Sequence, residues 1–260
     1  MQFSDFITEQ KNTHMTHIED KVLYGGVKGT RDAILALRSL RDMLGGEHDG
    51  KVSVKWDGAP AIFCGTDPRD GEFFVAKKGI FAKSPKVYKS NADIDADTSG
   101  DLNTKLKLAL KHLPELGIKG IIQGDFLYSK SDVKTQKIKG KNYVTFHPNT
   151  IVYAVPKESD ASDAIMKSKI GIVWHTTYTG RSFETLKASY GVDVSRFNSS
   201  RNVWSQDATL RDLTNLTMSR KDTDEVTSYL STAGQIFNQI SGTTLRTLEK
   251  DPELAQLIEQ

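Results

Sequence analysis

A lysine at the end of an alternating apolar run, followed two residues later by an acid and then a glycine, is the part of this sequence best suited to chemistry. The run over residues 52–55 predicts a strand that ends at Lys55, and Asp57-Gly58 predicts a tight turn directly after it. Nucleotidyl transfer through a covalent lysine needs an amine that is rigidly placed and deprotonated. Burial and neighbouring cations can lower a lysine pKa from about 10.4 to about 7–8. We therefore expect Lys55 to act as a nucleophile; the alternative is a solvated lysine beside an ordinary hairpin turn.

A second chemical anchor is the pair Gly124-Asp125, which lies within an apolar run over residues 121–126. The run predicts a strand, and a glycine in a strand lets the backbone approach a ligand closely. The carboxylate of Asp125 could then hold a ribose hydroxyl or a divalent cation. An ordinary turn is the alternative for an isolated Gly-Asp pair.

Lysines gather in two segments of the sequence, of which the first is a candidate for contact with phosphates. The first contains Lys77 and Lys78, expected neighbours of Lys55, and mixes lysines with aromatic rings, a combination able to meet phosphates and stack on bases. A solvated face is its alternative. Its members are Phe73, Phe74, Lys77, Lys78, Phe81, Lys83, Lys86, Tyr88 and Lys89. The second segment predicts an exposed hairpin around Gly140, with Lys130, Lys134, Lys137, Lys139 and Lys141.

The composition excludes several classes of protein. The chain has 260 residues, of which 37% are hydrophobic, enough for one good core and a smaller satellite domain. With 35 basic and 33 acidic residues the net charge is +2, unlike proteins that coat nucleic acid indiscriminately. The sequence contains no run approaching the roughly 20 apolar residues that span a bilayer, and its N-terminal segment is too polar for a secretory signal. We expect a cytoplasmic protein without membrane contact, with its single cysteine, Cys64, filling the core.

Hydrophobic periodicity divides the chain into three segments. Residues 1–50 predict a helical preface, 51–184 a strand-rich core and 185–260 a helical C-terminal region. Predicted helices cover residues 33–44, 102–113 and 226–240, and predicted strands cover 52–54, 61–64, 72–76, 118–126, 143–146, 150–155 and 170–176.

The acid-rich segment 85–100 lacks the spacing of a calcium loop, and we expect it to be a mobile loop. His14 and His17 could share a helical face but lack a third metal ligand nearby. The expected fold class is α+β, with a strongly bent, mixed but mainly antiparallel sheet and helices at both ends.

The two anchors together resemble the covalent nucleotidyltransferase superfamily, which contains the ATP-dependent DNA and RNA ligases and the mRNA-capping guanylyltransferases. Lys55-Trp56-Asp57-Gly58 looks like the nucleotide-accepting motif, residues 75–79 look like the basic strand that follows it, and Gly124-Asp125 looks like the Gly-Glu of the third motif, shortened by one methylene. The likeness covers roughly residues 50 to 180 and implies the fold of a ligase adenylation domain. The whole chain is also similar to proteins of tailed phages related to T4, especially marine ones, which share residues 13–20, 55–60, 148–153 and 174–176. That similarity implies the cytoplasm of an infected bacterial host.

The resemblance implies an ATP-dependent, ligase-like enzyme that uses ATP and Mg²⁺. Lys55 would attack the α-phosphate, expel pyrophosphate and pass the adenylate from a lysyl-AMP to the 5′-phosphate end of a nucleic acid. The residues implied in nucleotide binding are Asp57, Gly58, Lys77, Lys78, Gly124, Asp125, Phe146 and His175, with Asp125 also a metal ligand. An aromatic ring, Phe146 or Tyr153, would stack on the base, although core packing is an alternative for both.

The sequence departs from the superfamily at two motifs. The fourth motif should place an acid before the glycine of an apolar strand, and the best candidate has Ile170 there. The lysine pair that should grip the α-phosphate is represented only by Lys167 and Lys169, which precede the strand; His175 could replace one lost cation. Two alternatives therefore stay open: a diverged, non-catalytic member that binds nucleotide or nucleic-acid ends, and an accessory protein acting through protein contacts.

Overall fold

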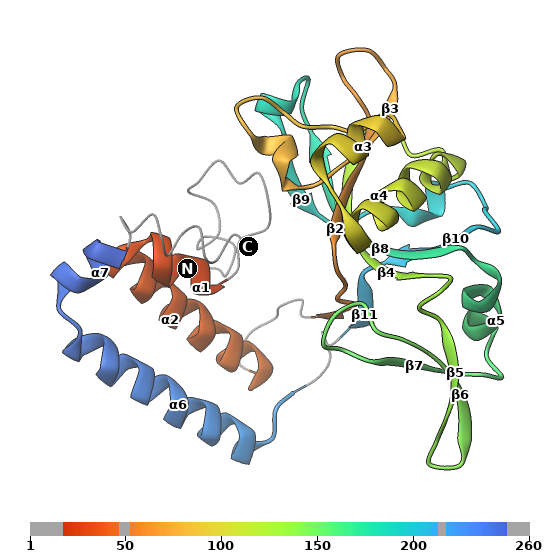
Figure 1. Ribbon diagram of the computed structural model, residues 1–260. Coiled ribbons are helices and arrows are strands. Elements are labelled where there is room, and N and C mark those ends of the chain that lie inside the picture. Colours follow the sequence, from red (N-terminus) through yellow and green to blue (C-terminus); the bar gives the residue numbers. More distant parts are fainter. Residues whose placement is uncertain (1–17, 47–52, 213–216, 249–260) are drawn as a thin grey trace. The chain divides into compact units, whose positions relative to one another are not determined.

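The chain folds as two compact units (Figure 1). The computed structural model describes residues 18–46, 53–212 and 217–248. One unit comprises Met1–Ser53 and Asp212–Gln260, and the other comprises Val54–Arg211. Helices make up most of the described part of the first unit, whereas the second combines helices with mostly antiparallel strands. The expected α+β class, with helices toward both ends of the chain, is confirmed.

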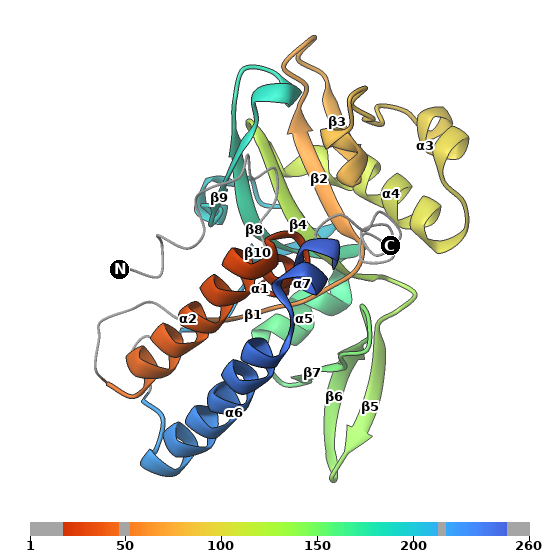
Figure 2. The same ribbon diagram turned by 90° about the vertical axis from the view of Figure 1, so that its left-hand side faces the viewer.

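The first unit is a helical assembly. Its helices are α1 (Ile18–Tyr24), α2 (Gly26–Leu44), α6 (Arg220–Gln239) and α7 (Gly242–Leu248). The helices predicted over residues 33–44 and 226–240 are confirmed as parts of α2 and α6, which run side by side (Figure 2). A hydrogen bond of 3.3 Å from Arg41 to Thr227 joins the two helices. His14 and His17 lie outside the described residues.

The second unit is built on a six-stranded sheet in the order β10-β8-β4-β2-β3, with β9 also paired to β8. The strands are β2 (Ala61–Thr66), β3 (Phe73–Ala76), β4 (Ile121–Ser129), β8 (Ile170–Thr179), β9 (Lys187–Tyr190) and β10 (Val203–Asp207). β10 runs parallel to β8 and the other neighbours are antiparallel, so the sheet is mixed, as expected. β4 is buried along its whole length, which places its residues at the centre of the unit.

Helix α4 (Gly100–His112) covers one face of this sheet, and α3 (Asn91–Asp97) precedes it. Leu106 and Ala109 of α4 pack with Ile122 and Phe126 of β4 in one core cluster. Cys64 belongs to the same cluster and is fully buried, as predicted, and burial raises the pKa of its thiol. The helix predicted over residues 102–113 is confirmed. The mobile loop predicted over residues 85–100 is wrong, because Ser90 and Asp93 form a reciprocal capping box that starts α3.

A three-stranded sheet and α5 (Asp160–Lys167) cover part of the opposite face. The strands β5 (Lys134–Ile138), β6 (Lys141–Phe146) and β7 (Tyr153–Pro156) are antiparallel neighbours. Val144 and Phe146 of β6 pack with Leu127 of β4 and Ile165 of α5. Every residue of β5 is exposed, which confirms the hairpin predicted around Gly140.

The third sheet is a short ribbon in which β1 (Ser53–Lys55) pairs with β11 (Thr209–Asp212). The expectation that the chain turns helical after Thr185 is wrong, because β9, β10 and β11 precede α6. Val203 and Trp204 of β10 are buried against two core clusters, a tertiary environment that local periodicity does not report.

Short 3₁₀ turns link the elements: η2 (Lys78–Phe81), η3 (Leu113–Leu116), η4 (Phe183–Thr185) and η5 (Val194–Arg196). Among the described residues, none of the helices combines the length and the apolar character that crossing a bilayer requires.

Candidate functional site

The ammonium of Lys55 lies between two carboxylates. Lys55 ends β1, and its Nζ lies 3.1 Å from Oδ1 of Asp57 and 3.4 Å from Oδ2 of Asp125. Asp125 stands on β4, 70 positions along the chain, and only 9% of its side chain is exposed, whereas 43% of the Lys55 side chain is exposed. The two chemical anchors of the sequence therefore meet at one place on the surface of the sheet-containing unit.

The loop after Lys55 is fixed by hydrogen bonds to β4 and to Ala208. The N–H of Ala59 donates to the carbonyl of Phe126 at 3.0 Å, and the N–H of Trp56 donates to the carbonyl of Ala208 at 2.6 Å. A Cβ on Gly58 would lie 2.6 Å from the carbonyl oxygen of Phe126, closer than side chains pack. Glycine is therefore required there by the approach of the loop to β4, which brings Asp57 beside Asp125.

Two side chains from the segment leading into β7 hold Asp57. The hydroxyl of Tyr153 accepts a hydrogen bond from the N–H of Asp57 at 2.7 Å and donates one to its carbonyl at 3.0 Å. The amide of Asn149 donates to Oδ2 of Asp57 at 2.7 Å. Sequence reasoning named Tyr153 only as a stacking candidate and did not single out Asn149. The available signal was the polar pair of residues 149–150 directly before an apolar strand.

A β-bulge places His175 next to Asp125. Gln123 pairs with Thr176 and Gly124 pairs with Trp174, so His175 is the extra residue between them. Bulges redirect side chains, and Nε2 of His175 lies 3.4 Å from Oδ1 of Asp125. Its Nδ1 lies 2.7 Å from the buried hydroxyl of Thr176. One Asp125 carboxylate thus contacts both Lys55 and His175.

Gly124 has a different physical role from the one expected. The sequence suggested that this glycine lets the backbone approach a ligand. In the structure a Cβ there would lie 2.3 Å from the carbonyl oxygen of Val173 and 2.6 Å from Cε3 of Trp174. The neighbouring strand β8 therefore requires the glycine, and Gly124 serves the site by allowing the bulge that carries His175.

The electrostatics around Lys55 favour its protonated form. Burial lowers the pKa of Lys55, but the charge of Asp125 and the hydrogen bond and charge of Asp57 outweigh it, so the pKa is raised above its ordinary value. This direction is opposite to the one expected for a nucleophile. Lys55 is a cation in this state, and any reaction of its amine must begin by breaking an ion pair.

Three of the expected binding residues lie apart from this cluster. Nζ of Lys77 pairs with Asp97 at 3.0 Å, and Lys78 is exposed at the start of η2. Phe146 is fully buried, with its ring against those of Tyr128 and Tyr153. Because the ring of Phe146 has no exposed surface, it cannot stack on a nucleotide base, and its role in this structure is core packing. The residues brought together are Lys55, Asp57, Gly58, Asp125 and His175.

Lys105 of α4 is a further cation that sequence reasoning missed. Its Nζ lies 3.4 Å from the carbonyl of Ala59 and 2.9 Å from Asp101, and only 13% of its side chain is exposed. It also lies over the ring of Phe126, 5.7 Å from the centroid. Its position three residues after Leu102 and four before Ala109 puts it on the apolar stripe of the helix, which was the signal for an inward-facing lysine.

Comparison with known protein families gives a match over nearly the whole chain. Residues 12–259 match a family described as "Family of unknown function (DUF6267)". The chain belongs to the DUF6267 family. No curated protein and no solved structure matches it. Because the match spans nearly the whole DUF6267 chain, the helical unit and the sheet-containing unit are both parts of what defines the family.

The Lys55 cluster of the DUF6267 protein offers two carboxylates to a metal ion. Among the described residues there is no group of three or more His, Cys, Asp and Glu side chains that could hold a metal. Mg²⁺ commonly binds one or two carboxylates and completes its shell with water and substrate phosphates. Asp57 and Asp125 could supply two carboxylate ligands to such an ion, and both lie within 3.4 Å of Nζ of Lys55.

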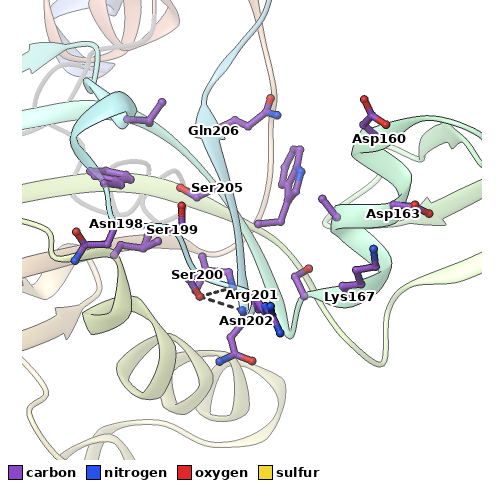
Figure 3. A pocket seen from close by; sticks show the side chains of 17 residues that line it. Asp160, Asp163, Lys167, Asn198, Ser199, Ser200, Arg201, Asn202, Ser205 and Gln206 are labelled. Atoms are coloured by element: carbon purple, nitrogen blue, oxygen red, sulfur yellow. Dashed lines mark hydrogen bonds between the residues drawn. The ribbon is translucent and has the colours of Figure 1, made fainter.

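A separate hollow of about 1050 Å³ lies between α5 and β10 of the DUF6267 protein (Figure 3). Asp160, Asp163 and Lys167 line it from α5, and the loop over residues 198–202 lines it from the opposite side. None of Lys55, Asp57, Asp125 and His175 borders this hollow. The candidate site is therefore a cluster at the end of β1 and distinct from it.

Proposed function

We propose that the DUF6267 protein is a nucleotidyltransferase that resembles an ATP-dependent RNA or DNA ligase. In this proposal Lys55 forms a lysyl-AMP and passes the adenylate to a 5′-phosphate end. The observation that carries the proposal is the position of Nζ of Lys55, 3.1 Å from Asp57 and 3.4 Å from Asp125. It supports the proposal because a lysine, the acid two residues later and an acid from another strand must meet for this chemistry, and they do so here.

The first step exchanges one bond to phosphorus for another. The neutral amine of Lys55 attacks the α-phosphorus of ATP, the bond from that phosphorus to the bridging oxygen breaks, and pyrophosphate leaves with the electron pair. The ammonium loses two protons overall, one before attack and one when the phosphorus–nitrogen bond forms. Asp57, whose Oδ1 lies 3.1 Å from Nζ, is the nearest acceptor for the first of them. In the second step an oxygen of the 5′-phosphate attacks the same phosphorus, the phosphorus–nitrogen bond breaks, and Lys55 leaves as the amine with the electron pair and one proton taken up at nitrogen.

The raised pKa of Lys55 describes the resting state in this proposal. Asp125 and Asp57 neutralise the ammonium while the site is empty of nucleotide. A magnesium ion bound with ATP would add positive charge to these carboxylates, which weakens their hold on the ammonium and favours the neutral amine. His175, 3.4 Å from Asp125, holds the other carboxylate oxygen and orients the group.

A label-transfer experiment tests the proposal. The purified full-length protein is incubated with Mg²⁺ and α-labelled ATP or GTP, denatured in detergent at alkaline pH, where a phosphorus–nitrogen bond survives, and examined for label that stays on the chain. We expect label from one of the nucleotides, its loss in Lys55→Ala, and its retention in the control Lys119→Ala, which removes an exposed lysine elsewhere on the same unit. Absence of transfer from both nucleotides, with each shown to bind, would reject the enzyme.

A diverged protein that binds nucleotide or nucleic-acid ends without transfer is the second candidate. The observation that favours it is Ile170, which occupies the place expected for an acid and is fully buried at the start of β8. A metal ligand of the conventional enzyme is therefore missing. Calorimetric binding of ATP without alkali-stable label on the chain would favour this candidate. Neither binding nor label would favour an accessory protein that acts through protein contacts.

A further inference from the structure

We infer that the β5–β6 hairpin, residues 134–146, is an arm that binds the phosphate backbone of a nucleic acid. Its place beside Lys55 as a holder of the acceptor strand rests on the proposed function, whereas the binding itself does not. We call this segment the lysine hairpin.

The lysine hairpin carries positive charge that the protein leaves uncompensated. Residues 133–157 contain no Asp or Glu, and their lysines are Lys134, Lys137, Lys139, Lys141 and Lys157. Within the described residues, the four lysines of the hairpin itself form no ion pair, whereas Lys77, Lys86, Lys89 and Lys107 all pair with carboxylates. A chain of net charge +2 thus concentrates unpaired cations on one exposed two-stranded projection.

The turn of the hairpin contains a lysine in a backbone conformation that other residues adopt more readily. Ile138 pairs with Lys141, so Lys139 and Gly140 form a two-residue turn, with φ of 46° and 83°. Positive φ at both positions is the type I′ pattern, for which Asn-Gly is the favoured sequence. Among the described residues other than glycine, Lys139 is the only one with positive φ. A lysine at this strained tip indicates that its charge serves a purpose outside the fold.

The hairpin is connected to the candidate site through Tyr153 of β7. Phe146 at its base pairs with Tyr153 of β7, and the hydroxyl of Tyr153 holds the main chain of Asp57. From Phe146 to Gly140 the strand extends by about 20 Å at roughly 3.3 Å per residue. Along a duplex this length corresponds to about six base pairs at 3.4 Å each, enough for several phosphates. The arm can hold a strand while its end lies near Lys55.

The side chains of the hairpin fit a phosphate backbone better than bases or a membrane. Tyr143 is its only aromatic residue apart from buried Phe146, so it lacks a platform on which several bases could stack. Its tip is Lys139-Gly140, without an apolar residue to enter a lipid layer, and Ile138 behind it is 37% exposed. Lysines spaced along a projecting ribbon neutralise phosphates, and they do so without regard to sequence.

The test compares two variants that carry the same change in charge. In the hairpin variant Lys134, Lys137, Lys139 and Lys141 become Gln; in the control Lys111, Lys119, Lys187 and Lys221, all exposed and outside the hairpin, become Gln. Fluorescence anisotropy without ATP measures binding to labelled single-stranded and duplex oligonucleotides over a range of salt concentrations. With four phosphate contacts, we expect the hairpin variant to lose about 10²- to 10³-fold in duplex affinity and to reduce the salt slope by about 3.6, with little change in the control. Equal losses in both variants, or no loss in either, would overturn the inference.

A single substitution separates binding from folding. Lys139→Asn should leave Tm unchanged or raise it by up to about 2–4 °C, because Asn tolerates the left-handed conformation better. The same substitution should weaken nucleic-acid binding several-fold.

Binding to vesicles of phosphatidylserine and phosphatidylcholine serves as the comparison with binding to oligonucleotides. If the hairpin binds the vesicles more tightly than the oligonucleotides, the inference is overturned in favour of a membrane. If the hairpin binds nucleic acid but no lysyl-AMP forms, the proposed function is rejected and the inference about the hairpin stands. If label transfer occurs but the hairpin variant binds nucleic acid as well as the wild type does, the inference is overturned and the proposed function stands.

Discussion

The hydroxyl of Tyr153 makes two hydrogen bonds to the main chain of Asp57, accepting from its N–H at 2.7 Å and donating to its carbonyl at 3.0 Å. The same ring lies against Trp56, with the centroids 4.6 Å apart. A residue of the three-stranded sheet therefore sets the conformation of the loop between Lys55 and Gly58. The loop that carries the proposed chemistry is positioned by a strand nearly 100 positions away in the chain.

Replacing Tyr153 with Phe removes these hydrogen bonds and keeps the ring. We expect a loss of about 1–2 kcal/mol in the free energy of unfolding, measured with urea. Label transfer to Lys55 should slow by about tenfold, since each 1.4 kcal/mol of misplacement costs one factor of ten. The control is Tyr190→Phe, because Tyr190 is 52% exposed and, within the described part of the chain, its hydroxyl makes no hydrogen bond. Equal rates of label transfer in Tyr153→Phe and Tyr190→Phe would show that Tyr153 does not position the loop that carries Lys55.

Gly58→Ala should be far more damaging than Gly79→Ala. A Cβ at position 58 would meet the carbonyl of Phe126 at 2.6 Å, whereas at position 79 the nearest atom is Cβ of Lys86 at 3.5 Å, an ordinary contact. We expect Gly58→Ala to destabilise the protein by about 1–3 kcal/mol and to abolish label transfer, because the loop must move away from β4. Thermal unfolding and label transfer of both variants check this. A Gly58→Ala variant with full label-transfer activity would contradict the close approach of this loop to the carbonyl of Phe126.

The contact between His175 and Thr176 can be measured with a double-mutant cycle. Thr176 is fully buried and its hydroxyl lies 2.7 Å from Nδ1 of His175. His175→Ala should cost about 1–3 kcal/mol of unfolding free energy, because it leaves a buried hydroxyl without a partner. Adding Thr176→Val should recover part of that cost, with a coupling energy of about 1 kcal/mol. A coupling of zero would mean that the hydrogen bond does not orient the histidine.

The rate of lysyl-AMP formation should rise with pH. Below the pKa that Lys55 has in the complex with nucleotide, the fraction of neutral amine increases by about a factor of ten per pH unit, and so should the rate while chemistry is the slow step. Asp57→Asn removes a hydrogen bond and a charge that raise this pKa, so the ascending limb should move to lower pH. Single-turnover label transfer between pH 6 and pH 10 gives both profiles. Superimposable profiles would contradict the assignment of the limb to Lys55.

The same ion pair predicts how stability depends on pH. Because the folded protein holds the proton on Lys55 more tightly than the unfolded chain does, the contribution to stability is complete below the unfolded pKa of about 10.4 and is lost as pH rises through the folded pKa. Since 43% of the side chain is exposed, solvent screening limits the effect to about 0.2–1 kcal/mol. Urea unfolding of the wild type and Lys55→Gln should show a difference at pH 8 that shrinks as the pH rises above the unfolded pKa of about 10.4. If the stability difference between the two proteins grows as the pH rises, the pKa of Lys55 is lowered by folding and the prediction is wrong.

Short-range patterns in the sequence were sufficient for much of the fold. The apolar stripes of α2, α4 and α6 and the strand character of β2, β4 and β8 follow from residues within one or two turns or alternations of each other. The Lys55-x-Asp57-Gly58 arrangement is equally local, since a strand end followed by a turn places an amine and a carboxylate within reach. Those features needed no knowledge of distant parts of the chain.

Only the tertiary structure decided which distant residues join Lys55 and in what charge state. Asp125 reaches it because β2 pairs with β4, and His175 reaches Asp125 because β8 carries a bulge opposite Gly124; register and bulges depend on contacts between strands far apart in the chain. Lys77 and Phe146 had suitable types, yet an ion pair with Asp97 and burial in the core assign them elsewhere. The pKa of Lys55 rises and does not fall because the carboxylates that surround it come from tertiary packing, and electrostatic energy depends on distances in space that the order of residues does not contain.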